Sequence, residues 1–334
     1  MKIVFFGTPQ FAVPSLKALI AHPNFEVLGI VTQPDKRRGR GGKITPSPVK
    51  VTAQDLIPER PIWQPARIKT DTETLAKLDA LEADAFVVIA YGQILSQTML
   101  DMPRWGCVNA HGSLLPEYRG AAPIQWCLYR GERETGVTTM LMDAGMDTGP
   151  MLMEEKIEIG LLDNAWQISN KLATLSADML PVTLEKLQQQ MIRPTPQDGE
   201  RATYAPLIEK EDYALNWTKS AKALHDQIRG FYPNCVTQFQ GKPMKVLMTV
   251  PLGAAFWTQL PSELSDLQAL HESASINETH TPGDIVAILK HYGPVIQTGE
   301  GQLLLREVKP QGKRALSGWD FANGNRLSVG ETLE

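Results

Sequence analysis

Short apolar runs alternate with longer amphipathic stretches over the first 190 residues, and this alternation constrains the fold more than any other feature of the sequence. The runs have the length of strands and lie at 2–6, 27–31, 85–90, 106–110 and 138–142. The run at 85–90 is apolar throughout, as expected of a strand that is buried on both faces of a sheet. Strands that alternate with helices along the chain predict a doubly wound, mostly parallel α/β sheet.

Residues 191–209 separate this region from one with a different period. They are rich in proline and polar residues, which is typical of a linker. Beyond them apolar residues alternate at positions 244, 246, 248 and 250, which predicts short antiparallel strands in a small barrel or sandwich. A chain of 334 residues commonly divides into two domains. We therefore expect domains at 1–190 and 210–334, a linker at 191–209, and an irregular insert at 251–281 within the second domain.

The composition excludes several classes of protein. Hydrophobic residues make up 43% of the chain and charged residues 21%, which is ordinary for a globular protein and unlike a disordered or collagen-like one. The cysteines, Cys107, Cys127 and Cys235, are odd in number and lack CxxC spacing, so we expect neither a disulfide framework nor a zinc site. No run of 18 apolar residues and no signal-peptide cleavage site is present. We expect a cytoplasmic protein with no metal and no membrane partner.

A cluster of basic residues contrasts with the net charge of −4. Residues 36–50 contain no acidic residue and include Lys36, Arg37, Arg38, Arg40, Lys43 and Lys50. Three glycines interrupt the cluster, so we expect a flexible cationic loop that attracts phosphate groups. A solvated surface loop without a ligand is the alternative interpretation. The loop follows the second predicted strand, at the sheet edge where parallel α/β folds bind ligands, and this favours a function in binding.

The segment 106–116 contains the strongest candidates for chemistry. Asn109 and His111 lie two positions apart in a predicted strand, so their side chains should share one face. The glycine after His111 ends the strand and places both side chains at its carboxyl end. An amide beside an imidazole can stabilise the oxyanion that forms when a carbonyl is attacked. In the alternative, structural interpretation, Asn109 caps a turn and His111 is a buried histidine with satisfied hydrogen bonds.

A second polar loop follows the predicted strand at 138–142. It contains Asp143 and Asp147, and either carboxylate could orient His111 or accept a proton. The neighbouring glycines also fit an ordinary Asp-Gly turn. The sequence contains no GxGxxG, GxxxxGK[ST], HExxH or GxSxG motif. Their absence argues against a nucleotide-phosphate cradle, a metal site and a serine nucleophile, and favours direct transfer between two bound substrates.

A set of short motifs is spread over nearly the whole chain. They are Phe6-Gly-Thr-Pro9, Thr32-Gln-Pro-Asp35, Pro46-Ser-Pro-Val-Lys50, Asn109-Ala-His-Gly-Ser-Leu-Leu-Pro116, Tyr118-Arg-Gly-Ala-Ala-Pro-Ile124, Met146-Asp-Thr-Gly149, Thr203-Tyr-Ala-Pro206, Lys210-Glu-Asp212, Arg229-Gly-Phe-Tyr-Pro233, Pro282-Gly-Asp284 and Asp320-Phe-Ala-Asn-Gly324. This set resembles the methionyl-tRNA formyltransferase family, with a departure at 251–281. The Asn/His/Asp combination alone is shared with other formyltransferases, including those that modify sugar nucleotides.

The resemblance implies transfer of a formyl group from 10-formyltetrahydrofolate to the α-amino group of methionine on initiator tRNA. Asn109 and His111 would stabilise the oxyanion, and Asp147 rather than Asp143 would hold His111. The first domain would have the formyltransferase variant of the Rossmann fold, and the second an OB-like barrel that binds tRNA. Folate would lie along Ser113, Leu114, Leu115 and Pro116 and along the backbone at Ile89, Gln93 and Ile94.

The resemblance also implies the residues that bind tRNA. Arg40 would be the key residue of a loop that inserts at the acceptor end, and the full set is Lys36, Arg37, Arg38, Arg40, Lys43, Lys210, Lys309, Lys313 and Arg314. We expect a monomer. Two other functions remain open at this point: a formyltransferase acting on an amino-sugar nucleotide, and an RNA-binding protein that has lost catalysis on the same scaffold.

Overall fold

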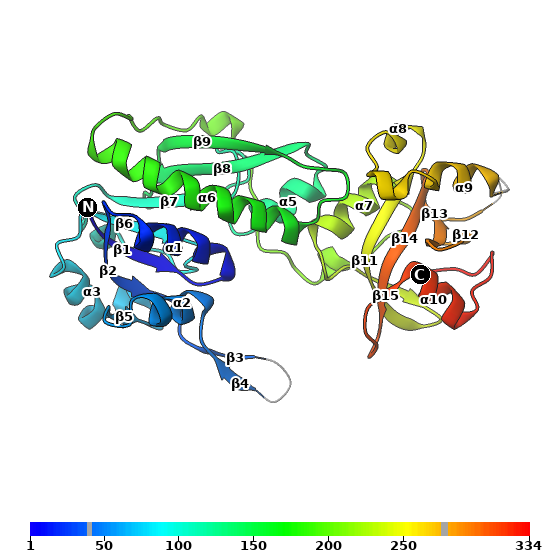
Figure 1. The fold of residues 1–334 in the computed structure, drawn as a ribbon, viewed down its shortest axis with the longest axis horizontal. Coiled ribbons are helices and arrows are strands. Elements are labelled where there is room, and N and C mark those ends of the chain that lie inside the picture. Colours follow the sequence, from blue (N-terminus) through cyan, green and yellow to red (C-terminus); the bar gives the residue numbers. More distant parts are fainter. Residues whose placement is uncertain (39–41, 275–279) are drawn as a thin grey trace. The chain divides into compact units, whose positions relative to one another are not determined.

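The computed structural model describes residues 1–38, 42–274 and 280–334 and is drawn in Figure 1. Its residues cluster into two compact units. The first comprises Met1–Pro123, Thr135–Ile157 and Ser169–Ala205, and the second comprises Ile124–Glu134, Glu158–Ile168 and Pro206–Glu334. Two short segments from the first half of the chain therefore cluster with the C-terminal residues.

The first unit is built on a seven-stranded sheet with the order β5-β2-β1-β6-β7-β8-β9. The strands are β1 (Lys2–Gly7), β2 (Glu26–Val31), β5 (Ile62–Trp63), β6 (Ala85–Ile89), β7 (Cys107–His111), β8 (Glu134–Leu141) and β9 (Met151–Glu158). Pairing from β5 to β7 is parallel, and β8 runs antiparallel to β7. This arrangement confirms the predicted doubly wound, mostly parallel sheet.

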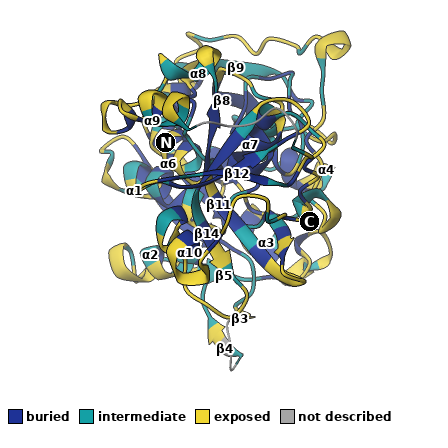
Figure 2. Ribbon diagram, turned by 90° about the vertical axis from the view of Figure 1, so that its right-hand side faces the viewer, coloured by how far each residue is buried: buried dark blue, intermediate teal, exposed yellow. Residues whose placement is uncertain are grey.

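Helices accompany the sheet because the apolar stripe of each needs a partner. They are α1 (Val13–Ala21), α2 (Pro48–Leu56), α3 (Thr72–Asp79), α4 (Gln97–Leu100) and α6 (Ala165–Gln188), with 3-10 turns at Gln10–Ala12, Ile68–Thr70 and Gly199–Arg201. The inner strands are largely buried, as Figure 2 shows for β8, and every residue of β6 is buried, whereas the edge strand β9 is half-buried to exposed. A proline at position 181 predicts either a helix break or a first-turn position there, and both are wrong, because α6 continues through Pro181 as one helix.

The basic segment forms a hairpin. Strands β3 (Lys36–Arg38) and β4 (Lys43–Thr45) pair antiparallel, with Arg37 opposite Ile44, and the hairpin projects from the body of the first unit (Figure 1). Helix α2 begins directly after it, where the Ser47 side chain accepts a hydrogen bond from the Lys50 amide and caps the helix.

The second unit is an antiparallel sheet with the order β10-β11-β14-β13-β12, and β15 pairs with β14. Its strands are β10 (Val236–Phe239), β11 (Lys242–Leu252), β12 (Ile285–Leu289), β13 (Gly293–Gln297), β14 (Gln302–Pro310) and β15 (Leu316–Ser317). The C-terminal residues pair with both edges, Leu333 with Phe239 and Thr332 with Asp284. Because these pairs join the two edge strands, the chain end closes the sheet into a barrel.

The helices of the second unit are α5 (Pro123–Tyr129), α7 (Ala221–Gly230), α8 (Ala254–Trp257), α9 (Leu267–Ser273) and α10 (Gly318–Asn325), with 3-10 turns at Glu211–Tyr213 and Ser262–Leu264. Residues 251–281 were expected to be irregular, but α8 and α9 form there. Leu264 and Leu267 are buried in one cluster with Val250 and Leu304. Helix formation in this segment therefore comes from packing on the barrel, since its residues lack a clear helical period.

The predicted alternation along β11 is only partly correct. Met244, Val246 and Val250 are buried, but Met248 is 40% exposed. The pairing of β11 with β14 shifts on both sides of Met248, which indicates a bulge that turns this side chain outward. Over the described residues, no helix is long and apolar enough to span a membrane.

Candidate active site

His111 and Asp147 lie together at the carboxyl end of β7. His111 is 7% exposed, and its Nε2 lies 2.9 Å from the Tyr118 carbonyl oxygen. A carbonyl can only accept, so Nε2 carries the proton and a neutral ring has a free lone pair on Nδ1. The Nδ1 atom lies 3.7 Å from Asp147 Oδ2. A second proton on the ring would therefore be stabilised by a carboxylate.

The two acids of the 142–150 loop have different surroundings. Asp143 Oδ1 accepts hydrogen bonds from the Gly145 amide and the Thr148 hydroxyl, so it shapes the loop. Asp147 Oδ2 accepts from the Gly120 amide at 2.8 Å and faces His111. The residue pattern left these two acids as alternatives and the family resemblance favoured Asp147, which is the acid that faces the histidine in the structure.

The antiparallel direction of β8 means that the order of the strands alone does not predict the position of Asp147 beside His111. Leu141 pairs with Val108 and Thr138 with His111, so the antiparallel β8 ends away from His111. Asp147 reaches the histidine because the loop after β8 turns back, and Asp147 itself has a left-handed backbone with φ 55°. A non-glycine residue adopts this conformation only when its surroundings enforce it.

Asn109 is held beside this pair by the neighbouring strand. Its Nδ2 donates to the Val88 carbonyl oxygen at 2.9 Å, and no second acceptor for this amide group lies among the described residues. Its Oδ1 is buried and likewise has no hydrogen-bond partner within the described part of the chain. Buried polar atoms are nearly always satisfied, so an unpartnered amide oxygen at the end of a strand indicates a position that a ligand completes.

A pocket adjoins Asp147. It is lined by Gln93, Ile94 and Leu95 after β6, by Met140 and Met142 from β8 and its end, and by Asp143–Asp147. Ile94 is 65% exposed and Met146 is 60% exposed, so two large apolar side chains border the pocket. The Gln93 side chain is already used, because it accepts from the Ile68 amide and donates to the Pro65 carbonyl.

The other residues predicted to contact folate are mostly interior. Ile89, Ser113, Leu115 and Pro116 are buried, and Leu114 is partly buried. Ser113 Oγ donates to the Glu117 carbonyl, and the Leu115 amide donates to Thr138 Oγ1. These hydrogen bonds define the shape of the loop after β7 and occupy groups that a ligand could otherwise use.

Two residues that the sequence reasoning missed support the 142–150 loop. The Gln197 side chain donates from Nε2 to the carbonyl oxygens of Asp147 and Gly149, both at 2.8 Å. Its Oε1 accepts from the buried Arg119 guanidinium at 2.9 and 2.7 Å. Arg119 lies in the motif Tyr118–Ile124, to which the sequence assigned no role. Gln197 lies in the predicted linker at 191–209, where the composition does not indicate any functional residue.

The base of the basic hairpin is held by hydrogen bonds. Lys50 Nζ donates to Asp35 Oδ2 at 2.8 Å and to Gln64 Oε1 at 2.7 Å, and Gln64 Nε2 donates to Asp35 Oδ1 at 2.7 Å. The hydrogen bond from Lys50 lowers the pKa of Asp35, so the pair is charged at neutral pH. Lys50 belongs to the basic cluster in the sequence, but its positive charge is compensated by the Asp35 carboxylate at the base of the hairpin.

The hairpin presents Lys36 and Arg37 as exposed side chains, while Arg38 and Lys43 form its last described pair. Arg40 lies outside the described residues. Sequence reasoning also missed Ile44, which is 60% exposed and lies across from Arg37. An exposed apolar side chain beside a cation gives the hairpin a mixed surface.

In the second unit, basic residues from distant parts of the sequence lie on one region of the barrel. Lys210 and Lys245 line one pocket, and Lys242 and Lys313 line another. Lys245 also pairs across the strands with Lys309. The predicted residues Lys210, Lys309, Lys313 and Arg314 are all exposed. Lys242 and Lys245, which sequence reasoning missed, connect the predicted residues through β11.

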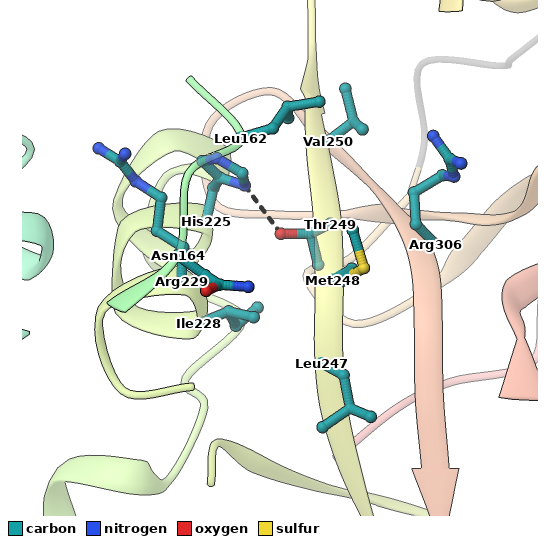
Figure 3. A pocket seen from close by; sticks show the side chains of 10 residues that line it. All are labelled: Leu162, Asn164, His225, Ile228, Arg229, Leu247, Met248, Thr249, Val250 and Arg306. Atoms are coloured by element: carbon teal, nitrogen blue, oxygen red, sulfur yellow. Dashed lines mark hydrogen bonds between the residues drawn. The ribbon is translucent and has the colours of Figure 1, made fainter. Parts of the chain in front are cut away.

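A small pocket beside α7 is filled by a buried polar cluster (Figure 3). His225 Nδ1 bonds Thr249 Oγ1 at 2.9 Å and Nε2 bonds the Leu161 carbonyl at 2.7 Å. Burial lowers the pKa of His225 to about 3, so the ring is neutral. Both ring nitrogens are used, which indicates a structural histidine. Among the described residues no three His, Cys, Asp or Glu side chains gather as a possible metal site.

Comparison with protein families and known proteins places the whole chain. The family described as formyl transferase matches residues 1–184, and its C-terminal domain matches residues 207–326. Similar proteins include methionyl-tRNA formyltransferases of Trichormus variabilis, 62% identical over 334 residues, and of Nostoc sp., 58% identical over 340. Each alignment covers 100% of this chain and 99% of the relative.

Solved structures share the fold at low identity. WlaRD, a sugar 3N-formyl transferase solved in the presence of dTDP and 5-N-formyl-THF, matches with a TM-score of 0.63 at 18% identity, over 94% of this chain and 99% of that chain. HypX from Aquifex aeolicus, in complex with tetrahydrofolic acid, matches with a TM-score of 0.60 at 14% identity, over 99% of this chain and 48% of that one. Full-length identity of 54–62% to eight relatives of one name is decisive beside these fold-level likenesses. The chain belongs to the methionyl-tRNA formyltransferase family.

Proposed function

We propose that this protein transfers the formyl group of 10-formyltetrahydrofolate to the α-amino group of methionine on initiator methionyl-tRNA. The observation that carries the proposal is the full-length identity to methionyl-tRNA formyltransferases, reaching 62%. The geometry at the end of β7 agrees with it, because a histidine, a carboxylate and an amide with a free N–H surround one position beside a pocket.

The proposed reaction is direct. The neutral methionyl amine attacks the formyl carbon, a C–N bond forms, and the carbonyl oxygen becomes an oxyanion. We assign its stabilisation to the free N–H of Asn109 and to the positive charge that His111 gains when it takes the proton of the amine. The amine loses a proton toward His111 Nδ1, where Asp147 stabilises the charged ring. Collapse breaks the bond from carbon to the folate nitrogen, which takes the proton from His111 and leaves as tetrahydrofolate, so that the histidine returns to its neutral form. An α-amino group has a pKa of roughly 8, so about a tenth of it is already neutral near pH 7.

We place folate in the pocket beside Asp147. Ile94 and Met146 offer apolar faces to the flat pterin ring. We assign the polar contacts at its edges to the backbone of Ile89–Ile94 and to those backbone groups of Ser113–Pro116 that are not bonded within the loop. The side chains of Gln93 and Ser113 act indirectly in this proposal, since both are bonded within the protein. Their contribution is to hold the loops that form the walls.

We assign tRNA binding to two basic surfaces. The first is the hairpin with Lys36, Arg37, Arg38, Arg40 and Lys43, directed at the acceptor end. The second comprises Lys210, Lys309, Lys313 and Arg314, and we add Lys242 and Lys245 to it because they share pockets or strand pairs with these residues. Lysines on a barrel contact phosphates without reading base sequence. Catalysis and contact with the acceptor end then belong to 1–190 and the second tRNA contact to 210–334, joined by 191–209, in a monomeric, cytoplasmic enzyme.

The test is a transfer assay with purified protein, 10-formyltetrahydrofolate and charged initiator tRNA. We expect formyl-methionyl-tRNA as the product, and a loss of about 10²-fold or more in His111→Ala and Asn109→Ala. His22→Ala, a change outside the site, is the matched control and should retain full activity. An amino-sugar nucleotide offered as the alternative acceptor should give no product. Formylation of the sugar but not of the tRNA would refute the proposal.

A further inference from the structure

The Arg119 side chain is buried in a way that demands an explanation. It is 6% exposed, and among the described residues its guanidinium bonds one neutral group, the Gln197 amide oxygen. A buried cation without a carboxylate partner is costly, because it gives up its hydration for weaker interactions. Gln197 alone accepts two hydrogen bonds from it, through Nε and Nη2. The guanidinium therefore fixes the orientation of the Gln197 amide.

That orientation determines what the other end of the amide does. With Oε1 on Arg119, the Gln197 Nε2 must face the opposite way, and it donates to the carbonyls of both Asp147 and Gly149. Asp147 has its strained left-handed backbone at this point. Its carbonyl is held by Gln197 and its carboxylate by the Gly120 amide, so the residue is fixed at both ends.

Residues 118–120 connect this support to the histidine. The Tyr118 carbonyl bonds His111 Nε2, the Gly120 amide bonds the Asp147 carboxylate, and the Arg119 side chain leads to Gln197. The backbone of this tripeptide is itself paired with residues 203–205, since the Arg119 amide donates to the Thr203 carbonyl and the Ala205 amide donates to the Arg119 carbonyl. One short segment thus contacts both members of the catalytic pair.

We propose that Arg119 and Gln197 are positioning residues for the transfer reaction, which act by fixing the Asp147 carboxylate opposite His111. This inference rests on the proposed function. Neither residue is assigned a contact with substrate. Their effect passes through two carbonyl oxygens of the catalytic loop, and a displacement of about 1 Å at a reacting group can lower a rate by about 10²-fold.

Two substitutions at one position separate positioning from simple stabilisation. Gln197→Glu keeps an acceptor for Arg119 and turns the contact into an ion pair, so we expect the melting temperature to stay equal or rise. It removes the Nε2 donor and sets a carboxylate against the two carbonyls, so kcat should fall by about tenfold or more. Gln197→Leu should lower both the melting temperature and kcat, because it leaves the guanidinium unpartnered. Arg201→Leu is the matched control, since Arg201 is exposed in the same segment.

The measurements are kcat, the two KM values, the pH profile of kcat, and the ¹⁵N NMR signals of the His111 ring. In Gln197→Glu we expect both KM values within about twofold, a displaced pH profile and altered ring signals, because the carboxylate facing Nδ1 has moved. A folded Gln197→Glu protein with wild-type kcat, pH profile and ring signals would overturn the inference. If the wild-type protein transferred no formyl group, the proposed function would fail. The ring signals would still decide whether Gln197 positions Asp147 against His111.

Discussion

Replacing Gly149 with alanine is the most direct perturbation of the catalytic loop. A Cβ atom at this position would lie 1.8 Å from the Leu141 carbonyl oxygen, whereas real Cβ contacts are essentially never under 3.0 Å. The contact is backbone to backbone, so no side chain can rotate to relieve it. The loop or the end of β8 must therefore shift by roughly 1.2 Å. Gly149 lies two residues from Asp147, and the carbonyl oxygens of both residues accept hydrogen bonds from Gln197 Nε2. A shift of the backbone at Gly149 should therefore also displace the Asp147 carboxylate.

The expected result is a fall of about 10²-fold in kcat, because a misplacement of about 1 Å at a reacting group has that effect. This corresponds to about 2.7 kcal/mol of lost transition-state stabilisation. Overpacking destabilises a fold by about 1–3 kcal/mol against a total stability of about 5–15 kcal/mol, so the protein should remain folded. The assay is the initial rate of formyl transfer with both substrates saturating, together with a thermal melt.

Gly199→Ala is the matched control for this experiment. The added Cβ has no atom within 4 Å there, and Gly199 lies in a 3-10 turn of the predicted linker. We expect its kcat to stay within about twofold of wild type, since surface changes of this kind are nearly neutral. A folded Gly149→Ala protein with a kcat equal to that of the control would refute the reasoning that the loop backbone sets the position of Asp147.

Three further predictions test other parts of the molecule. Lys50→Met should raise the KM for charged tRNA by about tenfold and leave the KM for folate unchanged, because the base of the hairpin loses its ion pair. The control Lys17→Met should change neither KM. Burial lowers the pKa of His225 from 6.5 to about 3, so the contribution of this residue to stability is complete above pH 6.5 and is lost as the pH falls toward 3. Urea unfolding should give a free energy of unfolding about 2 kcal/mol lower at pH 5 than at pH 6.5. This difference should be absent in His225→Gln. Leu267→Ala should cost about 2–5 kcal/mol in the same unfolding experiment, against almost nothing for the exposed neighbour in Gln268→Ala, and equal effects would contradict the packing of α9 on the barrel.

The pattern of apolar residues was sufficient to predict those strands whose burial follows from their own sequence. The runs at 2–6 and 85–90 correspond to β1 and β6, which are buried apart from the exposed Lys2 and end at Gly7 and Ile89, because a strand covered on both faces needs apolar residues. The same reasoning failed at Met248, where a bulge inverts the alternation, and at 251–281, where helices form through contact with the barrel. Local patterns carry no record of such contacts.

The sequence by itself determined the class of fold, the family, and the candidate set that contains Asn109, His111 and two acids. These properties are local, since they depend on which residues follow one another within a strand and its loop. The residue pattern left two acids open and the family resemblance favoured Asp147; the tertiary structure shows how this acid meets the histidine, because β8 runs antiparallel and its loop turns back onto residues 118–120. It alone connected Gln197, about fifty residues further along the chain, to the carbonyl oxygens of that loop. Such a contact joins segments that are distant in the sequence, so no local pattern of residues predicts it, and it forms only when these segments pack together in the folded molecule.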